Sequence, residues 1–224
     1  MITATYIDHM GSDLSVVNAA RVSFGKKSEG VLSWVAYGDK LAKPVFVPNE
    51  ADTKLIHYLA NHGHYSPFGH CFASFHIKAP IFVARQLVKH EYLRMNEISR
   101  RYVDSEPEFY LPDVWRGRAK DKKQGSAGEV KLPYLVPHEF YKSALYEYET
   151  LLEAGVAPEM ARMVLPQSMY TEWYWSGSMD AFANMCNLRL KEDTQYETRL
   201  VAQQIDKVMG ELYPVSWKAL VHHG

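Results

Sequence analysis

The chain has 224 residues, of which 47% are hydrophobic and 13% aromatic, and this composition supports a folded core and excludes a disordered chain. Its formal net charge of −1 argues against a general polyanion binder and leaves room only for a local basic pocket. No apolar run approaches about 18 residues and no signal peptide is recognisable, so we expect neither a membrane span nor a membrane partner. Cys71 and Cys186 lack Cys-x-x-Cys spacing, which indicates a reducing compartment and hence a soluble, cytoplasmic protein.

Periodicity and capping signals predict a chain of few strands and long amphipathic helices. Asp52 is expected to cap the second helix, and a capping box, Thr194-x-x-Glu197, is expected to start the last long one. This mixture predicts an α+β fold in one domain that spans residues 1–224. The predicted strands cover residues 1–8, 71–78 and 168–175, and the predicted helices begin near residues 12, 52, 80, 137, 158, 178 and 194.

Two segments are predicted to be loop excursions. Residues 25–50 are rich in Lys, Gly and Pro and indicate a surface insertion, with a hairpin around Tyr37-Gly38-Asp39 as the alternative. Residues 104–134 contain a charged run from Arg116 to Lys123. This run favours a mobile, solvated loop over a phosphate-binding patch.

The stretch from Arg85 to Tyr102, RQLVKHEYLRMNEISRRY, concentrates polar side chains next to an apolar approach. Pro80 is placed to start a helix, and Val83, Leu87 and Val88 are predicted to form one buried face of it. Buried polar groups without partners cost roughly 1–3 kcal/mol each. The cluster must therefore pair internally or bind a ligand, and its Arg, Ser and Asn donors suit an anionic one.

Four clustered histidines suggest a metal site, and two cysteines suggest a nucleophile. The chain has no His-Glu-x-x-His motif, no Cys partner and no carboxylate at ligand spacing, so we expect no metal and interpret the clustered histidines as loop residues that satisfy backbone groups or contact a ligand. Cys71 lies on the apolar side of a predicted strand and Cys186 lies within a predicted helix, so both are interpreted as core residues rather than nucleophiles. The clustered histidines are His62, His64, His70 and His76.

A nucleic-acid surface is the third alternative. The basic residues of the 85–102 stretch have Tyr92 and Tyr102 nearby for base stacking. However, Glu91 and Glu97 interrupt them, and the chain is close to neutral. We therefore expect no nucleic-acid partner.

Five blocks, in order, resemble the flavin-dependent thymidylate synthases. The family signature is Arg-His-Arg followed by Ser, with Asn-Glu-x-Ser-x-Arg-Tyr, and here it is matched by His90, Asn96, Glu97, Ser99, Arg101 and Tyr102. One block alone would be weak evidence, but five in the same order are specific. The other four blocks are residues 18–23, residues 62–68, residues 161–175 and residues 187–197.

Three positions depart from the signature. Lys89 replaces the first Arg, so the positive charge is kept but the bidentate fork of Arg is lost. Glu91 replaces the second Arg and reverses a charge, and Arg94 stands where the family has Ser. Our hypothesis is that Arg94 restores the positive potential lost at Glu91.

The resemblance implies a function and an assembly. It implies a small, mainly antiparallel sheet packed with long helices, and a methyltransferase that converts dUMP to dTMP without a cysteine nucleophile. Methylenetetrahydrofolate would supply the carbon, FAD the hydride and NADPH the electrons that reduce the flavin. It also implies a homotetramer in which each active site is shared between subunits. The alternatives are a related flavoenzyme that adds a one-carbon unit to a pyrimidine nucleotide, and a non-catalytic nucleotide-binding homologue.

The resemblance also implies the site residues. Arg189 would be the catalytic residue that stabilises negative charge on the uracil ring, the alternative being an Arg that closes a helix C-terminus. Because no Gly-x-Gly-x-x-Gly occurs, FAD would not be held by a Rossmann fold. The implied substrate-binding residues are Gln86, Lys89, Glu97, Ser99, Arg100, Arg101, Arg162 and Arg189. The implied flavin-binding residues are His64, Ser66, Lys89, His90, Glu91, Glu97 and Asn184.

Overall fold

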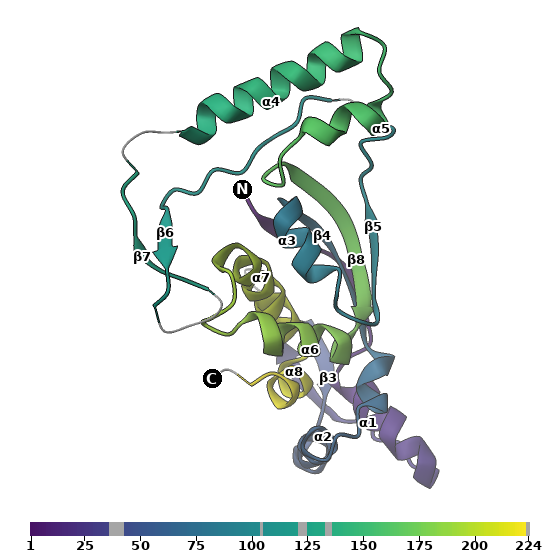
Figure 1. Cartoon of the computed structure of the whole chain (residues 1–224). Coiled ribbons are helices and arrows are strands. Elements are labelled where there is room, and N and C mark those ends of the chain that lie inside the picture. Colours follow the sequence, from purple (N-terminus) through teal and green to yellow (C-terminus); the bar gives the residue numbers. More distant parts are fainter. Residues whose placement is uncertain (36–42, 104, 121–124, 133–135, 223–224) are drawn as a thin grey trace.

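The structure, a computed structural model, describes residues 1–35, 43–103, 105–120, 125–132 and 136–222 (Figure 1). Its centre is a four-stranded sheet with the strand order β1-β4-β8-β5, and every neighbouring pair is antiparallel. The predicted α+β fold with a small antiparallel sheet is therefore confirmed. The strands are β1 (Thr3–Met10), β4 (Phe72–Pro80), β5 (Leu93–Glu97) and β8 (Tyr170–Ser178).

Helices cover one face of this sheet and both of its ends. In Figure 1, α3, α6 and α7 lie on one side of the sheet, α1, α2 and α8 gather below it, and α4 and α5 lie above it. None of the helices within the described residues is long and apolar enough to span a membrane. The helices are α1 (Asp13–Arg21), α2 (Glu50–Asn61), α3 (Ile81–Leu87), α4 (Val136–Glu153), α5 (Pro158–Ala161), α6 (Met179–Arg189), α7 (Tyr196–Leu212) and α8 (Pro214–Leu220), with 3₁₀ turns η1 (Val22–Phe24), η2 (Ser66–His70) and η3 (Arg162–Val164).

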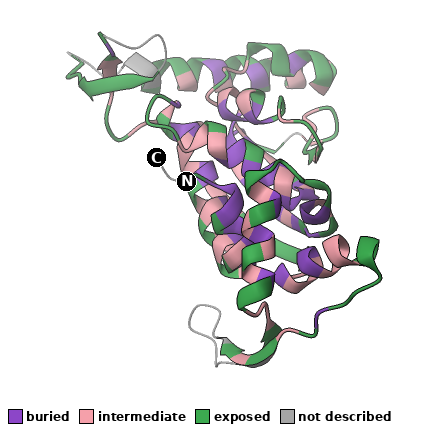
Figure 2. Cartoon of the chain, turned by 90° about the horizontal axis from the view of Figure 1, so that it is seen from below, coloured by how far each residue is buried: buried purple, intermediate pink, exposed green. Residues whose placement is uncertain are grey.

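The core forms where the inner face of the sheet meets α6. The ring of Phe182 packs edge-on against Phe75 and Trp175, at centroid distances of 5.3 and 5.5 Å. The alternate residues of β4 and β8 point the other way and stay partly exposed, as Tyr174 does. Figure 2 shows the same division, with buried positions on the inner faces of the elements and exposed positions outside. An antiparallel sheet with one packed face produces this alternation.

The 85–102 stretch does not stay helical. α3 ends at Leu87, the chain turns through Tyr92 with φ of 61°, and β5 then pairs with β8. Leu93 lies opposite Gly177, where an added Cβ would come within 2.4 Å of the Leu93 side chain, so a glycine is needed for β5 to approach. Val83 and Leu87 are buried as predicted, but the prediction for Val88 is wrong because this side chain is 54% exposed.

The predictions for the N-caps of α2 and α7 are also wrong. Asn49, not Asp52, caps α2, because Asp52 is fully buried and its carboxylate accepts hydrogen bonds from Arg21, at 2.7 Å, and from Ser28. The N-cap of α7 is Gln195, which makes no side-chain capping bond. Tertiary partners therefore take the Glu197 carboxylate, whereas Asp52 combines its tertiary partners with the N3 place in a capping box, where it accepts from the Asn49 N–H at 3.4 Å.

The Thr194 and Glu197 side chains of the expected capping box have other partners. The Thr194 hydroxyl donates to the Leu188 carbonyl oxygen at 3.1 Å. Glu197 accepts hydrogen bonds from Tyr110 and Arg116 instead. Both donors come from a segment that the sequence indicates as a loop.

Both expected excursions contain paired strands. In residues 25–50, β2 (Val31–Val35) pairs antiparallel with β3 (Lys43–Val47), and the predicted turn at Tyr37-Gly38-Asp39 lies outside the described residues. In residues 104–134, β6 (Arg116–Arg118) pairs with β7 (Ser126–Glu129). The expectation of a solvated loop for this second segment is incomplete, because Arg116 and Tyr110 reach the start of α7.

A buried carboxylate joins the two ends of the chain. Asp13, the first residue of α1, is 5% exposed and accepts hydrogen bonds from the backbone N–H groups of Val215 and Ser216 at 3.0 and 2.8 Å. These N–H groups belong to the first turn of α8, where donors have no partner within the helix and a negative charge is favourable. Asp13 therefore caps a helix more than two hundred residues away.

Removing this cap is expected to destabilise the fold. Asp13→Ala would leave two buried N–H groups unpaired, and we expect the free energy of unfolding to fall by about 2 kcal/mol. Urea unfolding followed by circular dichroism measures the change. Glu211→Ala, which removes an exposed carboxylate at the end of α7, is the matched control and should have almost no effect. Equal stability of the two variants would contradict this role of Asp13.

Candidate functional site

A first cavity, the β5 cavity, gathers the residues predicted to hold a nucleotide phosphate. It has a volume of about 760 Å³ and lies where β5 ends and the chain turns towards residue 103. The opposite wall comes from η3. Its lining includes five of the predicted substrate-binding residues, which are Glu97, Ser99, Arg100, Arg101 and Arg162.

Local hydrogen bonds hold the turn after β5 in shape. The Ser99 carbonyl oxygen accepts from the N–H groups of Tyr102 and Val103 at 3.0 and 3.1 Å. The Ser99 hydroxyl oxygen accepts from Nε of Arg101 at 3.2 Å. At the β5 end, Glu97 accepts from the Thr171 hydroxyl of β8 at 2.6 Å. The turn therefore presents its side chains from a fixed backbone.

Three guanidinium groups of the β5 cavity are free of carboxylate partners. Among the described residues, Arg100, Arg101 and Arg162 form no ion pair. Arg162 donates only to a backbone carbonyl, that of Glu159, at 3.2 Å. Lys78 is different, because Glu108 pairs with it. Five glutamates also line the cavity, so its capacity to bind phosphate rests on directed guanidinium donors and not on net charge.

A second cavity, the Arg189 cavity, has a volume of about 740 Å³ and is lined by Gln86, Lys89, Arg189 and Gln195. Arg189 is the last residue of α6, which is where a helix-closing Arg would sit. Its side chain nevertheless leaves the helix. Nε donates to Nε2 of His90 and a terminal nitrogen donates to the Gln86 carbonyl oxygen, both at 3.0 Å. The guanidinium is thus held by α3 and the turn that follows it.

The histidine that receives this bond stays neutral. Burial, together with the positive charge of Arg189, lowers the pKa of His90 to about 4. Burial also lowers the pKa of Arg189. Near neutral pH the pair is therefore a charged donor on an uncharged acceptor, and the positive charge of Arg189 remains available to a ligand.

A third cavity, the His64 cavity, has a volume of about 690 Å³ and contains His64 and Ser66. Exposed rings of Phe24 and Tyr58 line it, together with the basic Arg21. Nε of Arg21 is buried and has no hydrogen-bond partner among the described residues. Because this atom is closed to solvent and Arg21 pairs with Asp52, the feature that fits a ring-bearing cofactor such as a flavin is the aromatic surface.

Two of the clustered histidines have partners within the protein. Nδ1 of His62 lies 2.8 Å from the Tyr58 carbonyl oxygen, and its ring stacks on Tyr58 with a centroid distance of 4.0 Å. His76 lies 3.1 Å from Glu172. Within the described ranges, no three His, Cys, Asp or Glu side chains are grouped so that they could hold a metal ion.

The structure does not bring all predicted residues together. Glu91 and Asn184 are exposed and line none of the three cavities. The residues predicted to bind phosphate lie in the β5 cavity, Arg189 lies in a second cavity, and His64 and Ser66 lie in a third. Gln195 was not among the predicted site residues, although it lies in the 187–197 block that resembles the family. It lines the Arg189 cavity and accepts a hydrogen bond from Gln86. Nothing in the sequence marked Tyr110, which lies in the expected loop.

Both cysteines are unsuited to act as nucleophiles. Burial raises the pKa of Cys71 to about 12, with a smaller contribution from Asp13. Burial also raises the pKa of Cys186 well above its ordinary value. Both thiols are free and buried, as the sequence predicts for core cysteines. A thiolate, the reactive form, is not populated at either position near neutral pH.

Comparison with known proteins gives a consistent family. The family model described as "Thymidylate synthase complementing protein" matches residues 5–215. A flavin-dependent thymidylate synthase from Thermus thermophilus is 40% identical over 97% of this chain and 74% of the relative. One from Kosmotoga olearia is 39% identical over 96% of this chain and 88% of the relative.

Solved structures agree with this result. The UMP/dUMP methylase PolB from Streptomyces cacaoi, bound with 5-Br UMP, superimposes with a TM-score of 0.78 at 30% identity, over 98% of this chain and 93% of that one. Its complex with 5-Br dUMP gives a TM-score of 0.77 at 31% identity, over 98% and 94% of the two chains. The chain therefore belongs to the flavin-dependent thymidylate synthase family.

Proposed function

We propose that the protein converts dUMP to dTMP with methylenetetrahydrofolate as carbon donor, FAD as hydride carrier and NADPH as the reductant of the flavin. The observation that carries this proposal is the anchored guanidinium of Arg189, which His90 and Gln86 hold in a cavity next to Lys89. Family membership supports the same activity. The chain would act as one domain across residues 1–224.

Phosphate recognition would fall to the β5 cavity. Arg101 and Arg162 supply guanidinium donors, and Ser99 supplies a hydroxyl. Arg100 lines the same space, although it donates to the Ser105 carbonyl oxygen in this structure. Charge-assisted hydrogen bonds to phosphate are stronger than neutral ones, so this cavity would fix the nucleotide and leave its base free to reach the reaction centre.

Activation of the base would fall to Arg189. The difficult step is to make carbon 5 of uracil nucleophilic without a covalent thiolate. A preorganised cation against the O2/N3 edge of the ring stabilises the negative charge that grows there. Gln86 would position the base from the same cavity, and Glu97 would position the sugar. The buried cysteines are consistent with a route that does not use them.

Flavin binding would involve residues from several places in the fold. His64 and Ser66 line a cavity with the aromatic side chains of Phe24 and Tyr58, which fits such a cofactor. Lys89, His90, Glu91, Glu97 and Asn184 would complete its site. When bound, reduced FAD supplies the hydride that completes the methyl group.

A homotetramer would account for the three separate cavities of one chain. In the proposed homotetramer, the β5 cavity of one subunit would face the Arg189 and His64 cavities of others, so each active site would be shared. This arrangement would also bring Glu91 and Asn184 to the flavin. The partners are then small molecules and further copies of the chain, without nucleic acid or membrane. Two free cysteines support a reducing, cytoplasmic location.

A second candidate differs in the nucleotide. The Streptomyces neighbour is a UMP/dUMP methylase, so a ribonucleotide is a candidate substrate here as well. This reading keeps the one-carbon chemistry and changes only the sugar. A non-catalytic nucleotide-binding role is the remaining alternative, and turnover separates all three.

Turnover with an Arg189 variant tests the proposal. Reduced, flavin-containing protein should form dTMP from dUMP and methylenetetrahydrofolate under anaerobic conditions. Arg189→Lys keeps the charge but loses the planar fork, and we expect kcat to fall by about a hundredfold with a smaller change in KM. Arg118→Lys, on an exposed part of β6, is the control. In a parallel assay UMP replaces dUMP: methylation of UMP but not of dUMP would favour the second candidate, and absence of any product from either nucleotide would refute catalysis.

Mixed tetramers test the sharing of sites. Arg162→Gln and Arg189→Gln should each abolish most turnover, because each removes one half of the site. If these residues act from different subunits, refolding a mixture of the two variants restores a measurable fraction of the activity. A mixture as inactive as its components would place both residues in the same subunit and overturn the shared site.

The unusual signature gives a separate prediction. Arg94 lies on β5 opposite Ser176, and neither Arg94 nor Glu91 forms an ion pair with another described residue. If Arg94 restores positive potential near the flavin, Arg94→Ala should raise the Kd for FAD, whereas Glu91→Ala should leave it unchanged or lower it. Fluorescence titration of apoprotein with FAD measures both values. Unchanged affinity in Arg94→Ala would remove this role.

A further inference from the structure

Gln195 lies at the start of α7, yet its side chain does not cap this helix. Its Oε1 instead accepts a hydrogen bond from Nε2 of Gln86 on α3. Both residues are partly buried and line the Arg189 cavity. The Gln195 side chain therefore serves this cavity and not its own helix.

The chain just before Gln195 is tied to the end of α6. The Thr194 side chain is buried, and its hydroxyl donates to the Leu188 carbonyl oxygen at 3.1 Å. Leu188 directly precedes Arg189, the last residue of α6. This bond fixes the place of Gln195 relative to Arg189.

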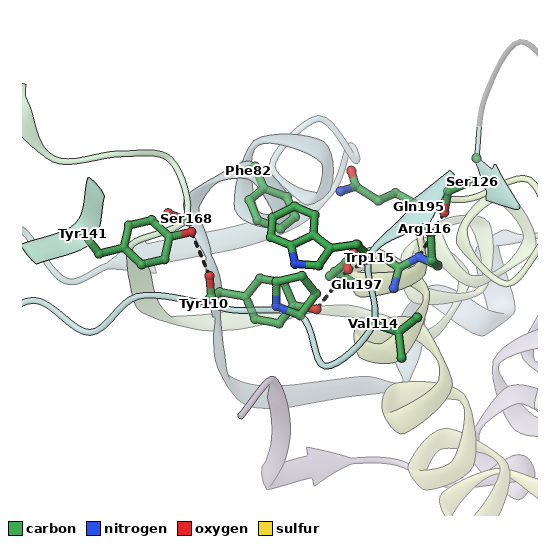
Figure 3. A pocket seen from close by; sticks show the side chains of 12 residues that line it. Phe82, Tyr110, Val114, Trp115, Arg116, Ser126, Tyr141, Ser168, Gln195 and Glu197 are labelled. Atoms are coloured by element: carbon green, nitrogen blue, oxygen red, sulfur yellow. Dashed lines mark hydrogen bonds and ion pairs between the residues drawn. The ribbon is translucent and has the colours of Figure 1, made fainter. Parts of the chain in front are cut away.

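The chain just after Gln195 is tied to a different part of the fold. Glu197 is 3% exposed, and it accepts hydrogen bonds from the Tyr110 hydroxyl at 2.9 Å and from Arg116, the first residue of β6. Figure 3 shows these two side chains at Glu197, and Gln195 lines the same space. Anchors on both sides thus hold Gln195 in one position.

Gln86 is in turn held at two points. Its backbone carbonyl oxygen accepts from Nη2 of Arg189 at 3.0 Å, and its side-chain Nε2 donates to Gln195. With Nε2 directed at Gln195, the amide has a defined orientation that leaves Oε1 for a ligand. Oε1 has no hydrogen-bond partner among the described residues, and it is not closed to solvent.

Arg189 presents a donor in the same cavity. Its Nε and Nη2 donate to His90 and to the Gln86 carbonyl oxygen. Its Nη1 has no partner within the described part of the chain and is likewise not closed to solvent. The cavity therefore offers an unused donor on Arg189 and an unused acceptor on Gln86.

This pair of groups matches the edge of uracil. With the guanidinium at O2, the acceptor of Gln86 meets the N3–H group of the ring. In the same pose cytosine would direct the lone pair of its N3 at that acceptor. A site built to bind an N–H group rejects an analogue without it, because the acceptor of the site is then left unpaired.

We propose that Gln195 is a positioning residue that makes the site select uracil over cytosine. It acts through Gln86, since by accepting from Nε2 it keeps Oε1 directed at the base. Without this bond the Gln86 amide can rotate and present its N–H groups, which suit the N3 atom of cytosine. The inference rests on the proposed function and deepens it, because it names a residue that determines which base is bound.

Calorimetric titration of the full-length, flavin-containing protein with dUMP and with dCMP tests the proposal. Methylenetetrahydrofolate is left out, so that binding is measured without turnover. The wild type should bind dUMP more tightly than dCMP. Gln195→Met removes the acceptor at a similar side-chain length, and we expect the ratio of the two affinities to fall about tenfold.

Two further variants should keep the wild-type ratio. Gln195→Glu still accepts from Nε2 of Gln86, so the orientation of the amide is preserved. Gln203→Met changes an exposed glutamine on the same helix and is the matched control. Gln195→Asn, whose side chain is too short to reach Gln86, replaces Gln195→Met if that variant fails to fold.

A double variant shows whether Gln195 acts through Gln86. In a Gln86→Met background the amide that Gln195 orients is gone, so adding Gln195→Met should leave the affinity ratio unchanged. A further fall in the ratio would show that Gln195 acts by another route and would overturn the proposal.

A merely structural role of Gln195 gives a different result. Equal weakening of dUMP and dCMP binding in Gln195→Met, or binding of both as in the wild type, would overturn the proposal. Loss of the ratio in Gln195→Glu would do the same. A wild type that binds the two nucleotides equally overturns this inference alone, whereas one that binds neither overturns the proposed function as well.

Discussion

Pairing of the short strand β5 with β8 is the constraint on which the proposed site depends. It brings the 85–102 stretch back along the sheet, and it requires the open space at Gly177, where a side chain would collide with Leu93. Thr171 of β8 then donates to Glu97 at the end of β5. The turn that carries Ser99 and Arg101 starts from this fixed point, so a rigid sheet holds residues that would otherwise lie on a free loop.

The same pairing connects the sheet with the rest of the site. α3 leads into β5, and the Gln86 carbonyl at the end of α3 receives the Arg189 guanidinium from α6. Because His90 is kept neutral by burial and by the positive charge of Arg189, the anchoring does not consume the positive charge. A cation held by neutral acceptors is suited to meet an electron-rich ring. The hydrogen bond from the end of α6 to the end of α3 therefore links the fold to the chemistry at Arg189.

The fold tolerates the three departures from the family signature because these residues lie outside the core. Lys89, Glu91 and Arg94 are exposed, so exchanging them does not disturb the core formed by Phe75, Trp175 and Phe182. Buried carboxylates behave differently. Asp13 and Glu197 each bind donors from distant segments, so they determine how the chain closes on itself. Substitutions at the exposed positions are expected to change ligand affinity, and substitutions at the buried ones stability.

The sequence by itself determined the fold class, the family and most of the helices and strands, because hydrophobic periodicity is local and five motif blocks are specific. It also indicated the grouping of Ser99, Arg101 and Arg162 through resemblance. Only the tertiary structure decided that Arg21 pairs with Asp52 and that Arg116 and Tyr110 bind Glu197, because these partners come from distant segments of the chain. The cavity lined by Tyr110, Trp115 and Glu197 was equally hidden, because the first two lie in a segment whose composition predicts a loop. Local pattern reports what a residue prefers, and long-range contacts decide which partner it receives.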